Sequence, residues 1–264
     1  MDGLAKIMAE QAPLTVRGAF YQAETAGLVV KSEQGYRKVQ RLLVKMREQG
    51  LIPWQAITDG TRWRRGPVTW RSPDEALRSW SEGYRRDLWA NSGEIVEVWL
   101  EKDALAGVIL PVTDQYAVDL MVCRGYPSLS FLHEAAEYAG DSGRALTIYY
   151  VGDRDPSGRD IPRMVEERLR EFGLRDFSLE LVAVTDQQVV DLELSTRPTK
   201  KTDTRSRGFD GGSVEVDAIP APMLRQIVRD KIVAHVDERE MEVLLGVEAE
   251  EREGLRRLAA GGTT

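Results

Sequence analysis

The sequence predicts an α/β protein of two modules, a basic helical module over residues 1–90 and a parallel-sheet, Rossmann-like module over residues 91–264. Helix signals dominate the first ninety residues, whereas apolar strands alternate with helices after them. The charge changes as well: residues 1–90 carry 15 Lys and Arg against 10 Asp and Glu (+5), and the rest carry 21 against 33 (−12). This asymmetry indicates a basic module joined to an acidic one, and a basic module is the usual electrostatic footprint of a protein that binds phosphate backbones.

Two helices are expected at the start of the first module. Thr15 can cap a helix that ends at Gly27, and Ser32 can cap a second one that ends at Gly50. The segment 51–70 is rich in Trp, Gly and Pro, which suits a β-wing, and no acid occurs from residue 60 to 73. Its expected DNA-backbone contacts are Arg62, Arg64 and Arg65. Two helices followed by a basic wing predict a winged helix-turn-helix.

A third helix should open at Ser72, where residues 72–75 form a capping box, and run to about Trp89. Residues 91–93 (NSG) are the expected boundary between the modules. Beyond them, strands are expected at 95–100, 118–123, 146–152, 177–184 and 213–216. Helices are expected at 103–116, 128–139, 157–172 and 222–245. We expect a mobile loop at 197–212 and a frayed tail after Glu248.

Acidic residues follow two of the expected strands. Glu101 comes just after the first strand, and Asp153 and Asp155 come just after the third. Because the carboxyl ends of parallel strands open onto one edge of a sheet, these carboxylates should converge. An all-oxygen cluster suits Mg²⁺, with Mn²⁺ as the alternative. The competing interpretation is that acids at strand ends are only solvated or cap a turn.

The motifs around these acids resemble those of a known family. The segment 98–104 (VWLEKDA) looks like the glutamate motif of Toprim domains, and 151–161 (VGDRDPSGRDI) resembles the D-x-D-P-x-G-x-D-I motif of one subgroup. That subgroup contains the A subunit of topoisomerase VI and the meiotic double-strand-break transesterase. Residues 124–127 (RGYP) resemble its G-K-G-Y-P loop, where Cys123 replaces the first glycine, and 214–219 (VEVDAI) resemble its E-I-Q-A-L segment.

The resemblance extends to the first module, where the family carries a catalytic tyrosine on a winged helix. Its motif, roughly T-x-R-D-I-(F/Y)-Y, is similar to residues 15–21 (TVRGAFY), which implies that Tyr21 is the nucleophile and Arg17 its neighbour on one helix face. Gly18 and Ala19 depart from the family pattern. The alternative is that Tyr21 is a core aromatic residue.

Together these features predict Mg²⁺-dependent breakage of double-stranded DNA by tyrosine transesterification. The family implies a homodimer, in which the tyrosine of one protomer meets the metal of the other, with catalytic residues Tyr21, Arg17 and Glu101. Lys102 and Arg124 are further expected contacts to DNA. Two alternatives stay open: a Toprim nuclease that uses metal-activated water, and a non-catalytic DNA-binding protein.

Composition limits the other classes of function. The single cysteine and two histidines leave too few ligands for a thiolate or histidine metal site, so carboxylates must hold any metal. No apolar run approaches the roughly 20 residues that cross a bilayer, and we expect no signal peptide. These features predict a cytoplasmic protein, nucleoid-associated if bacterial. The chain carries no P-loop, so strand passage would need a separate ATPase subunit.

Overall fold

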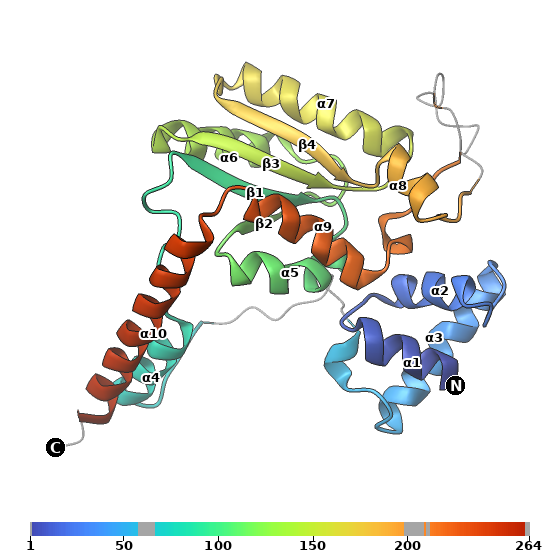
Figure 1. The fold of residues 1–264 in the computed structure, drawn as a ribbon, viewed down its shortest axis with the longest axis horizontal. Coiled ribbons are helices and arrows are strands. Elements are labelled where there is room, and N and C mark those ends of the chain that lie inside the picture. The colour runs from blue at the N-terminus through green and yellow to red at the C-terminus, as the bar shows by residue number, and fades with distance from the viewer. Residues whose placement is uncertain (1, 58–66, 198–208, 210–211, 262–264) are drawn as a thin grey trace.

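The computed structural model describes residues 2–57, 67–197, 209 and 212–261, and it confirms a mixed α/β fold around a four-stranded parallel sheet (Figure 1). The strands are β1 (Glu94–Leu100), β2 (Asp119–Val122), β3 (Ala145–Val151) and β4 (Phe177–Ala183). Their order across the sheet is β2-β1-β3-β4. β1 and β3 are the two central strands, which explains why β3 is apolar on both faces.

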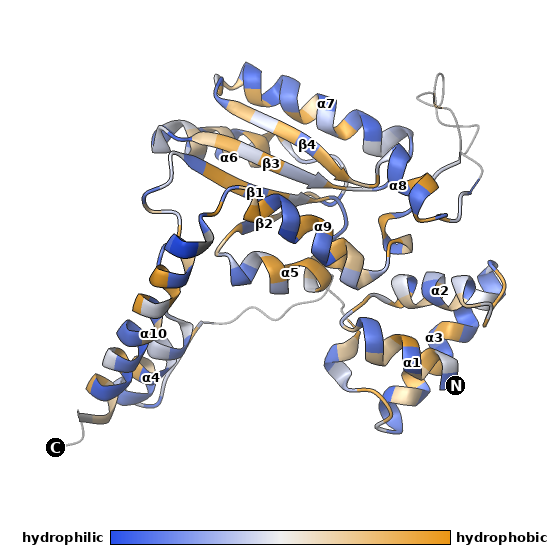
Figure 2. Ribbon diagram, in the orientation of Figure 1, coloured by the Kyte–Doolittle hydropathy of each residue, from blue (hydrophilic) through white to orange (hydrophobic). Residues whose placement is uncertain are grey.

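Helices cover both faces of the sheet. Helices α5 (Ala106–Gln115) and α9 (Ala221–Val233) lie on one face, and α6 (Leu129–Ser142) and α7 (Pro156–Glu171) lie on the other (Figure 1). Alternate strand residues therefore enter two separate apolar cores. Val98 belongs to the core with α5 and α9, and its neighbour Trp99 belongs to the core with α6 and α7. Figure 2 shows this concentration of apolar residues along the strands.

The N-terminal helices are α1 (Asp2–Gln11), α2 (Val16–Thr25) and α3 (Glu33–Glu48). The predicted caps are confirmed, since the side chain of Thr15 accepts from the Gly18 amide and that of Ser32 accepts from the Gly35 amide. Helix α1 was not expected from the sequence. These helices extend the core of the α5–α9 face.

The predicted wing falls partly outside the described residues. Arg62, Arg64 and Arg65 all lie in the gap from 58 to 66, so their expected contacts stay predictions. Just before this gap the chain forms a short 3₁₀ turn, Trp54–Ala56, and not a strand. A winged helix-turn-helix therefore also stays a prediction.

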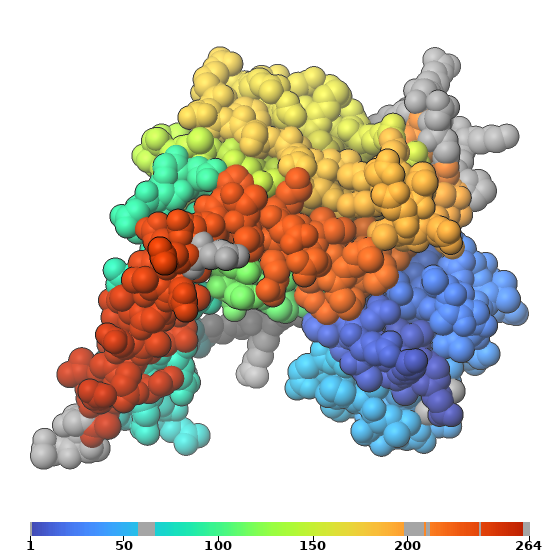
Figure 3. All heavy atoms as spheres, in the orientation of Figure 1, coloured from blue at the N-terminus to red at the C-terminus, as the bar shows by residue number. Residues whose placement is uncertain are grey.

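Two helices form an arm that the sequence did not predict, which we call the α4–α10 arm. It pairs α4 (Pro73–Gly83) with α10 (Glu238–Gly261) and projects from the body of the molecule (Figures 1 and 3). The expected helix from Ser72 to Trp89 ends earlier, at Gly83. Ser72 caps it as predicted, but the Glu75 carboxylate turns back to the Arg71 amide rather than to Ser72.

The C-terminal prediction was wrong in two respects. The single helix expected at 222–245 is divided into α9 and α10, because the Asp237 side chain accepts from the amides of Arg239 and Glu240 and so starts a new helix. The expected frayed tail is helical to Gly261. The packing of α10 on α4 explains this order, and Glu248, a residue only 4% exposed, contributes to it through its ion pair with Arg85.

The segment 212–219 also departs from the prediction. The expected strand at 213–216 forms only isolated bridges, one between Val214 and Arg154, and the chain then enters a 3₁₀ turn at Val216–Ala218. A short helix that was not expected, α8 (Asp186–Asp191), follows β4. Within the described ranges, no helix combines the length and apolar character needed to cross a bilayer.

Candidate functional site

The carboxyl ends of the two central strands bring Glu101 and Asp153 together, as the sequence predicts for these two residues. Glu101 directly follows β1, and its amide donates to the Val151 carbonyl at the end of β3 (2.9 Å). Its Oε2 accepts from the Asp153 amide at 3.0 Å. Parallel pairing of β1 with β3 therefore joins two acids that are 52 positions apart in the chain.

In the motif 151–161, Gly152 and Gly158 lie so close to neighbouring atoms that a side chain would not fit. A Cβ on Gly152 would lie 2.5 Å from Glu101 Oε2, so a side chain there would displace the carboxylate. A Cβ on Gly158 would lie 1.9 Å from the Asp153 carbonyl oxygen, so that glycine lets α7 start directly beneath the loop. Both glycines thus fix the position of the acids.

Asp155, the third predicted ligand, also has a structural contact. It is the N-cap of α7, and its Oδ1 accepts from the Gly158 amide at 2.8 Å. Across the part of the chain that the structure describes, no three His, Cys, Asp or Glu side chains are arranged as a ready set of metal ligands. Asp155 thus caps α7 and is still near enough for its charge to help raise the pKa of Glu101, so its role as a third metal ligand stays a prediction.

Lys102, predicted to contact DNA, instead lies among carboxylates. Its side chain is 22% exposed, and its Nζ is 2.8 Å from Asp153, 3.1 Å from Asp217 and 3.3 Å from Glu215. The last two acids come from the 3₁₀ segment, which the resemblance matched but to which sequence reasoning gave no role. The feature of the sequence that could have indicated this role is the pair of acids at 215 and 217 within an otherwise apolar segment.

The charges of this cluster are strongly coupled. Burial and the neighbouring Asp153 carboxylate raise the pKa of Glu101 to about 7. Burial also raises the pKa of Asp153, although Lys102 opposes the change. Burial alone would lower the pKa of Lys102, but the charges of Asp217, Asp153 and Glu215 outweigh it and raise that pKa.

These shifts test whether a metal would fit. A raised carboxyl pKa means that the ionised form lacks enough compensating positive charge, and a divalent cation would supply it. The oxygen-only donors Glu101 and Asp153 match the preference of Mg²⁺, which keeps several waters and needs few protein ligands. The residues present are therefore compatible with such an ion.

Helix α2 joins this cluster from the N-terminal module. The Thr15 hydroxyl donates to Asp217 at 2.5 Å, and an Arg17 guanidinium nitrogen donates to Glu215 Oε2, also at 2.5 Å. A continuous series of contacts therefore runs from Arg17 through Glu215 and Lys102 to Asp153. All of these contacts are within one chain.

Tyr21 lies beside the same segment but is covered. Its side chain is 3% exposed, and the Lys31 ammonium and Arg197 guanidinium lie over its ring, 5.4 and 5.5 Å from the centroid. Burial and the charge of Glu215 raise the pKa of the Tyr21 hydroxyl well above its ordinary value, against the opposing charges of Arg197 and Arg17. In this conformation Tyr21 is a buried phenol next to three cations. Lys31 and Arg197 were not singled out from the sequence.

Arg124 borders the acidic edge from the other side. It adopts a left-handed backbone conformation (φ 55°), and its guanidinium is 2.8 Å from Asp103 while its side chain stays 62% exposed. Together with Glu101 and Gly125 it lines an open depression of about 510 Å³. Arg124 is thus the one predicted DNA contact among the described residues that faces solvent beside Glu101.

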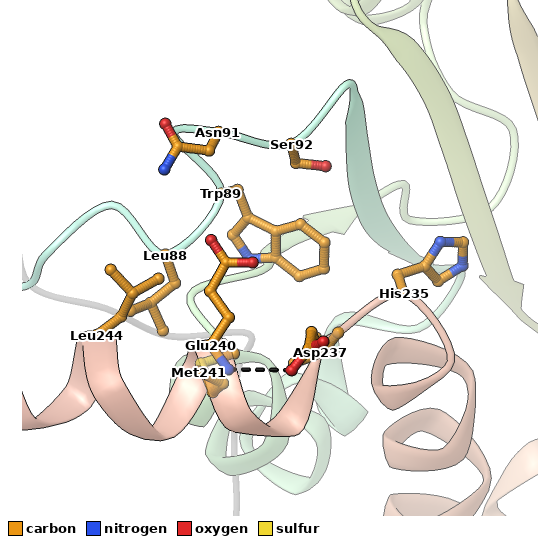
Figure 4. A pocket seen from close by; sticks show the side chains of 10 residues that line it. Leu88, Trp89, Asn91, Ser92, His235, Asp237, Glu240, Met241 and Leu244 are labelled. Atoms are coloured by element: carbon orange, nitrogen blue, oxygen red, sulfur yellow. Dashed lines mark hydrogen bonds between the residues drawn. The ribbon is translucent and has the colours of Figure 1, made fainter.

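A second depression, of about 190 Å³, lies at the root of the α4–α10 arm (Figure 4). Trp89 lies near its centre, with Leu88 and Met241 on one side and His235 on the other. His235 bonds Glu94, the first residue of β1, at 2.8 Å. This depression is therefore at the opposite end of β1 from Glu101 and contains none of the predicted site residues.

No protein-family model matches this chain, and no curated protein is similar enough in sequence to count as a relative. The assignment of a function therefore depends on the site itself.

Proposed function

We propose that this protein breaks DNA strands in a reaction that depends on Mg²⁺ or Mn²⁺ at the Glu101–Asp153 edge, with Tyr21 as the nucleophile. The observation that carries the proposal is the docking of α2 on residues 215–218, which links Arg17 to the Asp153 carboxylate through Glu215 and Lys102 and brings Tyr21 close to Glu215. The resemblance to Toprim domains of the topoisomerase VI A subunit group implies the same combination of a tyrosine on a helix with metal-binding carboxylates.

Each residue has a chemical role in this proposal. Glu101 and Asp153 would hold the ion, joined by Asp155 once its cap is released, and the ion would supply positive charge to the phosphate being cleaved. Arg17 would stabilise the charge that develops on the phosphate oxygens. Tyr21 would lose its hydroxyl proton, its oxygen would bond to phosphorus, and the 3′ oxygen would leave as a hydroxyl. The product would be a 5′-phosphotyrosyl bond that can be resealed.

The burial of Tyr21 also bears on this reaction. A phenol whose pKa is raised is a weak nucleophile, so the surroundings of Tyr21 would have to change before its hydroxyl attacks. DNA phosphates would attract Arg197, Lys31 and Arg17 and so change the surroundings of the hydroxyl. In the family the tyrosine and the metal come from different protomers, whereas α2 contacts residues 215–218 of its own chain here. We therefore include in the proposal that the protein forms a homodimer and that strand passage needs a separate ATPase partner.

The test uses supercoiled plasmid and the full chain with Mg²⁺ or Mn²⁺, stopped with detergent and divided into samples with and without protease. We expect cleaved DNA that carries covalent protein until proteolysis. Tyr21→Phe should abolish the covalent product, and Glu101→Gln should abolish all cleavage. Tyr116→Phe is the matched control because Tyr116 is half-buried near α5, away from α2. Intact DNA at every metal tested would refute the proposal.

A second candidate is hydrolysis by metal-activated water at the same carboxylates. The 3% exposure of Tyr21 favours it, because a buried phenol needs a rearrangement before it can attack. In this case the DNA would be cleaved without bound protein, and Tyr21→Phe would cleave as well as the wild type. Shifted but uncut DNA would point instead to a non-catalytic DNA-binding protein.

A further inference from the structure

A cationic pocket lies beside Tyr21, and Arg17 on its wall also takes part in the reaction proposed above. Its volume is about 600 Å³, and it is lined by Arg17, Phe20, Lys31, Ser32, Glu33, Tyr36, Thr196 and Arg197. Its walls come from α2, from the start of α3 and from the chain after α8. Sequence positions near 17, 31 and 197 therefore meet only in the folded chain.

The positive charges of this pocket outnumber the negative charges that neutralise them. Arg17 and Arg197 share one carboxylate, that of Glu215, at 2.5 and 2.8 Å. The same carboxylate also contacts Lys102 at 3.3 Å. Both guanidinium groups stay nearly half exposed, with side-chain exposures of 47% and 45%. The pocket thus holds more positive charge than Glu215 compensates.

Lys31 adds a third cation. Among the described residues it forms no ion pair within 4 Å, although the charges of Glu24 and Glu215 act on it; its Nζ lies 3.4 Å from the Thr196 carbonyl and over the ring of Tyr21. The other acid on the wall, Glu33, is paired with Arg37 at 3.1 Å. An anion in the pocket would therefore meet three cations.

The remaining walls indicate which anion fits. Ser32, Tyr36 and Thr196 can offer hydroxyl groups to phosphate or sugar oxygens. Of the two aromatic side chains on its walls, Phe20 is 2% exposed, and Tyr36 has the Arg17 guanidinium over its ring, 6.0 Å from the centroid, which leaves little ring surface for a stacked base. Such walls suit the backbone of a nucleic-acid strand better than a free nucleotide.

We propose that the pocket of Arg17, Lys31 and Arg197 binds a backbone phosphate of the DNA strand next to the one that Tyr21 attacks. This inference rests on the proposed function and adds Lys31 and Arg197 as residues that position the strand. The phosphate competes with Glu215 for both guanidinium groups. Its binding draws Arg197 and Lys31 away from the ring of Tyr21.

The test measures binding without cleavage. The full chain with Tyr21→Phe, in EDTA, is titrated into a fluorescent 20-base-pair duplex, and the dissociation constant is followed by anisotropy from 50 to 300 mM NaCl. Each lost phosphate contact should reduce the slope of log affinity against log salt by about 0.9. We therefore expect Lys31→Met and Arg197→Gln each to lower the slope by about that amount and to weaken binding about 3- to 10-fold at 100 mM salt.

The controls separate a specific contact from general charge. Lys6→Met removes a lysine of α1 that is 76% exposed and should leave the slope nearly unchanged. Lys31→Arg should keep the wild-type slope, and Glu215→Gln should tighten binding because it removes the competitor. Thermal midpoints equal to the wild type show that the variants fold.

Several outcomes would overturn the inference: slopes unchanged in both Lys31→Met and Arg197→Gln, or the same loss in Lys6→Met. Inorganic phosphate that displaces the duplex at constant ionic strength, with an effect lost in Lys31→Met, would assign the pocket to free phosphate instead. If the wild type cleaves DNA but Lys31→Met and Arg197→Gln keep the wild-type salt slope, the phosphate pocket is refuted and the proposed reaction is not. If both variants lower the slope but the wild type forms no covalent product, the tyrosine reaction is refuted and the pocket is not.

Discussion

Replacing Lys102 by methionine should destabilise the fold more than the loss of any surface lysine. The Lys102 ammonium lies 2.8 to 3.3 Å from three carboxylates, and the Asp217 side chain among them is only 2% exposed. At an effective dielectric constant near 20, each contact is worth about 5 to 6 kcal/mol before desolvation. Desolvation and repulsion between the acids cancel most of this sum, and the loss of one partner from a buried ion pair costs about 3 to 5 kcal/mol. We expect a loss in this range.

The assay is urea denaturation at pH 7.5 in EDTA, followed by circular dichroism. Lys231→Met is the matched control, because that lysine forms an exposed pair with Glu180 at 2.6 Å and should cost less than about 1 kcal/mol. Millimolar Mg²⁺ should restore part of the stability of Lys102→Met, since an ion bound by the folded state stabilises it. The restoration should disappear in the double variant with Glu101→Gln.

Two results would refute this reasoning. If Lys102→Met costs no more than Lys231→Met, the ammonium does not hold the cluster together. If Mg²⁺ stabilises Lys102→Met and its Glu101→Gln double variant equally, the ion acts elsewhere on the protein.

Three further predictions test other parts of the structure. Burial and the charge of Asp153 hold the pKa of Glu101 near 7 in the folded protein, above its value in the unfolded chain. The contribution of Glu101 to stability is therefore present below about pH 4.5 and is lost as the pH rises to 7. Glu101→Gln should therefore stabilise the metal-free protein at pH 8, by about 1 to 3 kcal/mol, and not at pH 4.5, in urea titrations; an equal effect at both pH values would contradict this. Gly158→Ala should lower the stability by about 2 kcal/mol or more, because the new Cβ would lie 1.9 Å from the Asp153 carbonyl oxygen. The control is Gly140→Ala, which should not destabilise the protein because nothing lies within 4 Å of a Cβ there; thermal melts compare the two variants. Glu248→Ala removes a 4% exposed carboxylate bonded to Arg85, so amide exchange should accelerate in both α4 and α10 and not in the sheet; an unchanged arm would refute the role of Glu248.

Much of the sheet and its helices could be predicted because their signals are local. An apolar run such as 146–151 indicates a buried strand wherever it occurs, and Thr15 and Ser32 cap the helices that follow them. The meeting of Glu101 with Asp153 could also be predicted, because parallel pairing fixes which ends of strands share an edge.

The α4–α10 arm could not be predicted in the same way. Glu248 is one acid in a charged C-terminal stretch, and nothing nearby in the sequence distinguishes it from a solvated residue. Its partner Arg85 is 163 positions away, and contacts of this kind between α10 and the chain around α4 exist only after folding. The frayed tail was therefore a reasonable expectation that tertiary packing overturned.

The sequence by itself determined the α/β class, the parallel sheet and the two acids at its carboxyl edge, since periodicity, caps and strand order act over short distances. Only the tertiary structure decided that Lys102 lies among carboxylates, that Asp155 caps α7, and that Arg17 shares Glu215 with Arg197. Ion pairs depend on which charges the packing brings within a few ångströms, and residues as distant as 17 and 215 meet only after the chain has folded.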